Sequence, residues 1–213
     1  MTASAPTVRR NEIIGVLSLA VDFAIGQPVG YGLRSAVASM GVARDMGCDE
    51  ALAAESYYQG LLQASGCNAE TDVLNALFGD EIRLRQEVAR IERADPAQML
   101  SLLLSHVGSG REGLTPQAPG DAAFKAIMGA ANQVFHSHCE TASKLAERLG
   151  LSGAVQRNLS QTHERWDGKG IPDGLAGDAI ALPVRIATVV HHCIRLGGFL
   201  PITEVAERVR SRS

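Results

Sequence analysis

This chain of 213 residues has few aromatic side chains, no long apolar run and no excess of charge of one sign. Phe, Trp and Tyr make up 4% of it while Ala, Leu and Val are abundant, which favours close-packed helices over sheets. The net charge of −3 gives no electrostatic reason to expect direct binding to nucleic acid or to a membrane. No stretch resembles a membrane span, and residues 1–10 lack the apolar core of a signal peptide.

Paired cysteine motifs are also missing. The chain has no CxxC spacing, and its four cysteines are scattered: Cys48, Cys67, Cys139 and Cys193. This pattern predicts reduced thiols and a cytoplasmic location. No Walker loop is present, which excludes the commonest nucleoside-triphosphate-binding motif.

The length suits one sizeable domain with a substantial core. We expect a disordered leader over residues 1–10, a single helical domain over residues 11–213, and a linker at about 108–120, where Gly, Pro and Ser concentrate. Apolar periodicity, interrupted by glycine and proline, predicts an all-α bundle of about seven to nine helices. These lie at residues 13–25, 33–46, 50–64, 80–93, 95–103, 121–149 (one helix or two), 152–163, 183–196 and 202–210.

The most distinctive stretch is HERWDGKGIPDG, residues 163–174. His163 and Glu164 are expected to close a helix. The glycines and the proline that follow forbid regular structure, so the backbone must turn in a rigid loop. Asp167 is expected to hold the turn by accepting hydrogen bonds from nearby backbone donors.

Together with the LPVRIATVV that follows, this loop resembles the signature of HD-GYP domains, helical metal-dependent phosphohydrolases of the HD superfamily. The resemblance implies an HD-domain-like bundle with an irregular loop, and a site where histidines and aspartates hold two or three metal ions. The residues that carry it are Thr162, His163, Glu164, Asp167, Gly168, Gly170, Ile171, Pro172, Gly174, Leu175, Gly177, Ile180, Leu182, Pro183, Arg185 and Ile186.

The metal ligands that the resemblance implies are largely replaced. In LLQASG, Gln63 and Ala64 stand where the family has its His-Asp doublet, and Tyr31 falls near its first histidine. Thr162 replaces one histidine of a pair, and His191 stands in place of an aspartate. Alanine binds no metal, and losing the carboxylate removes the charge that lets two dications approach each other. We therefore predict a catalytically degenerate domain without catalytic residues.

Three histidines leave a metal-binding alternative open. His138, His163 and His191 are expected to converge, and three imidazoles with an open fourth position would suit one zinc, iron or manganese ion. The other interpretation is that they are neutral core histidines, hydrogen-bonded to one another or to Gln63 and Thr162. On that interpretation the protein needs no cofactor.

A ligand-binding set is predicted around the same cleft. Arg165, Lys169 and Arg185 could hold a phosphate or a guanine edge, and Gln63 and Tyr31 at the altered ligand positions complete the set. The structural alternative is that Asp167 and Arg185 brace the loop while Trp166 packs against the bundle.

Two functions follow from these patterns. The first is a regulatory, ligand-binding or protein-interaction module in bacterial signalling, with a protein or a small nucleotide-like molecule as partner. The second is a metal-dependent phosphohydrolase, acting on a cyclic dinucleotide or another phosphoester, that uses the remaining histidines. A homodimer is also predicted, because exposed apolar surface would seek a second copy.

Overall fold

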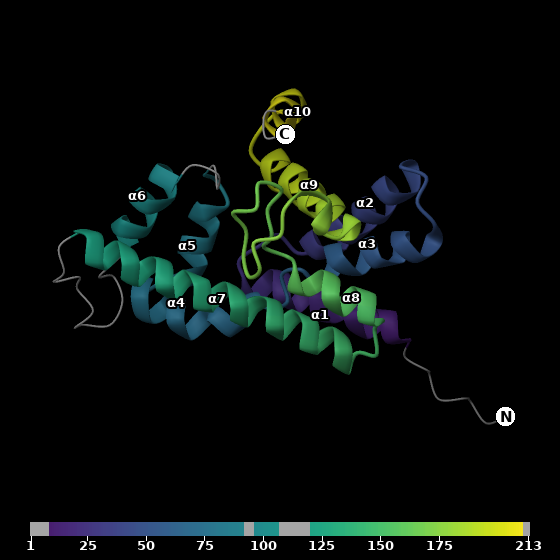
Figure 1. Ribbon diagram of the computed structural model, residues 1–213, viewed down its shortest axis with the longest axis horizontal. Coiled ribbons are helices and arrows are strands. Elements are labelled where there is room, and N and C mark those ends of the chain that lie inside the picture. The colour runs from purple at the N-terminus through teal and green to yellow at the C-terminus, as the bar shows by residue number, and fades with distance from the viewer. Residues whose placement is uncertain (1–8, 92–95, 107–119, 211–213) are drawn as a thin grey trace.

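The computed structural model describes residues 9–91, 96–106 and 120–210, and these form ten α-helices and two short 3₁₀ helices without a named strand (Figure 1). Residues 1–8 of the expected leader and nearly all of the expected linker lie outside these residues. The all-α prediction is confirmed. The elements are α1 (Arg10–Ala24), α2 (Tyr31–Asp45), α3 (Glu50–Leu62), η1 (Cys67–Glu70), α4 (Thr71–Phe78), α5 (Glu81–Val88), α6 (Pro96–His106), α7 (Gly120–Arg148), α8 (Gly153–Ser160), η2 (Gly177–Ala179), α9 (Leu182–Gly197) and α10 (Ile202–Arg210).

The structure adds one helix to the predicted set and moves several boundaries by a few residues. α4 was not predicted, because it follows η1 directly, with no glycine or proline to mark its start. α1 begins three residues earlier than expected, because Glu12 accepts hydrogen bonds from the backbone N–H of Arg9 at 2.9 Å and from its guanidinium at 2.7 Å. Arg9 and Arg10, placed in the expected leader, thus form the N-cap and the first residue of α1. α3 ends at Leu62, so Gln63 becomes its C-cap.

The α2–α3 pair is the centre of the fold, because two hydrophobic clusters meet on it. One cluster joins the pair to α1, α7 and α8, and the other joins it to α9. The first contains Ile14, Ala36, Leu61, Leu62, Ala142, Ala146, Leu151, Val155 and Leu159, and the second contains Ala43, Ala53, Ile186 and Val190. Burial of these side chains supplies the main driving force for the arrangement.

The remaining helices extend the bundle to one side. α4, α5 and α6 pack in succession on the side of the molecule where α7 begins, while α8 packs against α7 (Figure 1). The loop that joins α8 to α9 passes through the middle of the molecule, between these two groups. No helix in the described part of the chain combines the length and the apolar character needed to cross a membrane.

Candidate functional site

The C-cap of α3, Gln63, connects three other helices through hydrogen bonds. Its side-chain amide donates to Ser35 Oγ on α2 at 3.1 Å and to His191 Nδ1 on α9 at 3.2 Å. Its main-chain carbonyl accepts from His138 Nε2 on α7 at 2.7 Å. Gln63 is itself 9% exposed. The predicted degenerate position is thus a hydrogen-bonding junction between helices.

These bonds fix the protonation of two imidazoles. A carbonyl oxygen can only accept, so Nε2 of His138 must carry its proton. The amide nitrogen of Gln63 can only donate, so Nδ1 of His191 is the acceptor, and a neutral ring then carries its proton on Nε2. The inward orientation predicted for His138 is confirmed, as its side chain is 2% exposed.

His163 lies against His138 within an aromatic cluster. The rings of His163 and His138 meet edge to face, with their centroids 4.5 Å apart. The centroid of the Phe135 ring lies 4.6 Å from that of His163. Thr162, expected as a partner of the histidines, instead accepts a hydrogen bond of 3.1 Å from the amide of Gln59. The packing of His163 is therefore that of a core aromatic side chain.

Tyr31 opens α2 and contacts His191 on α9. The hydroxyl lies 3.1 Å from His191 Nδ1, and the two rings meet edge to face at 5.3 Å. Beneath it, the buried carboxylate of Asp22 accepts hydrogen bonds from the backbone N–H groups of Gly30 and Gly32. Burial raises the pKa of Asp22, although these hydrogen bonds oppose the shift. Asp22 thus holds the start of α2, and with it Tyr31, in place.

The described residues contain no group of three His, Cys, Asp or Glu side chains arranged to hold a metal ion. His138 donates from Nε2 to the carbonyl of Gln63, so only its Nδ1 could serve as a metal ligand. As arranged, the three histidines do not form such a group. Metal binding by His138, His163 and His191 stays a prediction.

Glu164 organises the loop after α8. Although it is a carboxylate, it is only 4% exposed, and its two oxygens accept from the backbone N–H groups of Asp173 at 2.7 Å and Leu175 at 2.9 Å. The backbone of Gly170 lies directly against that of Glu164 and Arg165, since a Cβ at Gly170 would be 2.3 Å from the backbone nitrogen of Arg165. Sequence reasoning missed the role of Glu164, because an acidic residue in a polar loop gives no signal of burial.

The two arginines of the predicted ligand-binding set, Arg165 on the loop and Arg185 on α9, are already engaged with carboxylates. Arg165 forms two hydrogen bonds with Asp167, at 3.0 and 2.7 Å, and this contact lowers the pKa of Asp167. Arg185 pairs with Asp178 and lies over the ring of Trp166 at 5.5 Å. An anionic ligand would therefore have to compete with these carboxylates.

Part of the predicted bracing of the loop is wrong. Trp166 is 59% exposed and does not pack into the bundle; it lies under the guanidinium of Arg185. Asp167 does hold the turn as expected, by accepting from the backbone N–H of Lys169 at 3.2 Å. The side chain of Lys169 is exposed. The predicted ligand-binding residues thus fall into an inner pair, Tyr31 and Gln63, and an outer set on the loop and the start of α9.

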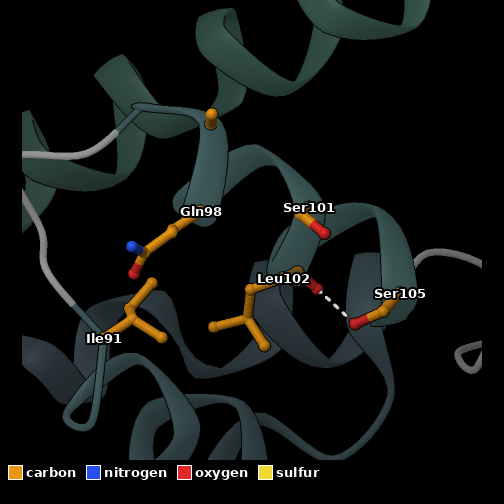
Figure 2. Close-up of a pocket in the computed structure, with 6 residues that line it drawn as sticks. Ile91, Gln98, Ser101, Leu102 and Ser105 are labelled. Atoms are coloured by element: carbon orange, nitrogen blue, oxygen red, sulfur yellow. Dashed lines mark hydrogen bonds between the residues drawn. The ribbon is translucent and has the colours of Figure 1, made fainter.

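A shallow hollow lies elsewhere, next to α6 (Figure 2). Its lining consists of Ile91, Ala97, Gln98, Ser101, Leu102 and Ser105, and Ser105 Oγ donates to the Leu102 carbonyl at 2.7 Å. None of the predicted site residues lines it, and it offers no ionisable side chain for chemistry.

Comparisons with known proteins find an HD domain in part of this chain. An HD domain family model matches residues 125–193, a segment that contains all three candidate histidines but neither Tyr31 nor Gln63. The chain is 21% identical over 188 residues to 3′3′-cGAMP-specific phosphodiesterase 3 of Vibrio cholerae, covering 88% of this chain and 41% of that protein.

A solved structure shows the same fold. The crystal structure of a cyclic GMP-AMP-specific phosphodiesterase from V. cholerae superimposes with a TM-score of 0.64 at 20% identity, over 94% of this chain and 44% of the other. The chain therefore spans less than half the length of the relatives it matches. The HD-type helical fold is confirmed, while the HD-GYP subtype and the loss of the metal site stay predictions.

Proposed function

We propose, from the HD domain match over residues 125–193, that this chain is a catalytically degenerate HD-GYP-like domain that works as a regulatory module. Its inner cleft would bind a small nucleotide-like ligand or a protein partner in place of hydrolysing a phosphodiester. The observation that carries the proposal is the position of Gln63. Its neutral amide bonds Ser35 and His191 where the HD-GYP resemblance implies a charged metal ligand.

The chemistry of the cleft supports a binding role. An amide and a phenol supply hydrogen bonds but no negative charge, and without that charge two dications cannot be held close together. Tyr31 and Gln63 can recognise polar groups of a ligand, while Lys169 provides an exposed cation on the nearby loop. We expect a ligand with an anionic group, such as a cyclic dinucleotide.

Two measurements test this function. In protein purified without a chelator, metal analysis should find less than about a tenth of an ion per chain, because the site lacks the ligands for tight binding. Titration calorimetry with cyclic dinucleotides should detect binding without turnover. Lys169→Ala should weaken that binding, whereas Lys144→Ala, which removes a cation paired with Glu140 on the surface of α7, should leave it unchanged.

A second candidate is a metal-dependent phosphohydrolase, and the similarity to the V. cholerae phosphodiesterase favours it. The residues that would hold an ion are His138, His163 and His191, and the ion would supply an activated hydroxide. Among the described residues, however, no three potential ligands are grouped to hold an ion. Stoichiometric iron, manganese or zinc, with hydrolysis of 3′3′-cGAMP that a chelator abolishes, would establish this function and refute the first.

A further inference from the structure

α1 is apolar on two opposite faces. One face packs into the core through Ile14 and Val21, which are 0% and 6% exposed. The opposite face carries three large apolar side chains in contact with solvent: Ile13 at 51%, Val16 at 67% and Phe23 at 78% exposed. Large apolar side chains gathered on one exposed helix face form the kind of patch that marks an interaction site.

The outer face has the spacing of a helix-to-helix contact. Ile13, Val16, Ala20 and Phe23, which we call the α1 stripe, are separated by three, four and three residues and are all exposed. This is the spacing that keeps one row of side chains facing a partner helix over the full length of α1. The small Ala20 within the row would let two helices approach closely.

We propose that the α1 stripe binds the α1 stripe of a second copy, with the two helices antiparallel about a two-fold axis. In this arrangement Ile13 faces the partner's Phe23, and Val16 faces the partner's Ala20, so that a large side chain meets a small one near the centre. Each contact occurs twice, as an isologous interface requires.

The two ends of α1 favour the antiparallel direction. Arg9, which pairs with Glu12, and Arg10, which donates to the Gly150 carbonyl, lie at its start, whereas its last turn contains no basic residue. Antiparallel pairing brings these guanidinium groups to the end of the partner helix, where the helix dipole is negative. Parallel pairing would place like charges and like dipole ends side by side.

The size of the contact sets the expected affinity. One pair of helices of 15 residues forms an interface at the small end of the specific range, so we expect a dissociation constant of roughly 1–100 micromolar. The dimer is therefore concentration-dependent, and its detection requires measurements on both sides of that range.

Sedimentation of the full chain at about 5 to 500 micromolar tests the proposal. The mass should rise from 22.5 kDa towards twice that value. Val16→Glu should raise the dissociation constant at least about tenfold, because it sets a charge in the centre of the apolar contact. Ile202→Glu, at a position on α10 that is 77% exposed and remote from α1, is the matched control and should leave the dimer intact.

The outcomes separate clearly. A wild-type chain that stays monomeric at the highest concentration overturns the proposal, and the stripe then contacts some other protein segment. A dimer that survives Val16→Glu, or that Ile202→Glu also breaks, overturns it too. Circular dichroism checks that each variant is folded. The double variant Val16→Lys/Ala20→Glu should form the dimer, because antiparallel pairing sets each new cation opposite a new carboxylate of the partner. A double variant that stays monomeric would overturn the antiparallel arrangement.

Discussion

The side-chain amide of Gln63 lies 3.2 Å from Nδ1 of His191, although 128 residues separate the two along the chain. The same amide contacts Ser35, so α2, α3 and α9 share a single polar junction. Buried polar groups of this kind stabilise a fold only while every partner is present.

Gln63→Ala should therefore lower the free energy of unfolding by about 1–3 kcal/mol, because Ser35 and His191 lose their shared partner in a buried site. Urea denaturation measures the change. Gln156→Ala is the control, since Gln156 bonds only the nearby carbonyl of Leu151 and should cost less than about 1 kcal/mol. Equal effects of the two substitutions would contradict a special role for Gln63.

Removal of the buried carboxylate in Glu164→Ala should release the loop after α8. The N–H groups of Asp173 and Leu175 lose charged acceptors, and we expect a loss of about 2–4 kcal/mol of stability. Hydrogen exchange at those two amides should become faster. Glu207→Ala, on the exposed side of α10, should change neither quantity. Unchanged exchange at Asp173 and Leu175 in the Glu164 variant would show that the carboxylate does not hold the loop.

Two glycines mark places where backbones touch. A Cβ at Gly60 would lie 2.8 Å from the main chain of Ser35, and one at Gly66 would lie 2.2 Å from the carbonyl of His138. Each Gly→Ala variant should thus lose about 1–3 kcal/mol in thermal or urea unfolding. Gly41→Ala, within α2 and with open space around it, should instead gain up to about 1 kcal/mol. A stabilised Gly60 or Gly66 variant would show that these helices can separate without cost.

The raised pKa of Asp22 gives a pH dependence whose sign can be worked out. The folded protein takes up this proton at a higher pH than the unfolded chain does. The stabilisation from this group is therefore complete below the unfolded pKa and is lost as the pH rises through the folded value. Asp22→Asn does not titrate, so the stability of the wild type relative to this variant should increase as the pH falls from about 7 to 4.

Unfolding curves of both proteins across this range measure the difference. Exposed carboxylates such as Glu12 and Glu50, whose pKa values are lowered by their arginine partners, titrate equally in both proteins and cancel. A difference that shrinks as the pH falls would mean that the hydrogen bonds to Asp22 outweigh its burial.

Much of the fold could be predicted from the sequence, because helix periodicity and glycine or proline stops are local signals. The N-cap of α8 at Ser152 and the stop of α2 before Gly47 follow from such signals. α4 could not be predicted in this way, since it follows η1 directly and no glycine or proline separates the two. On α7, His138 is buried while His136, two residues earlier, is exposed, as the helical period requires.

The sequence by itself determined that this protein is an all-helical bundle with a rigid loop after residue 163, and that Gln63 and Ala64 occupy positions where its HD-GYP resemblance implies metal ligands. Only the tertiary structure decided that Glu164 turns inward, that Trp166 stays outside under Arg185, and that Tyr31 meets His191 from a position 160 residues away. The physical reason is that burial and hydrogen-bond partners depend on distant segments meeting in space, and no local pattern of side chains specifies those contacts.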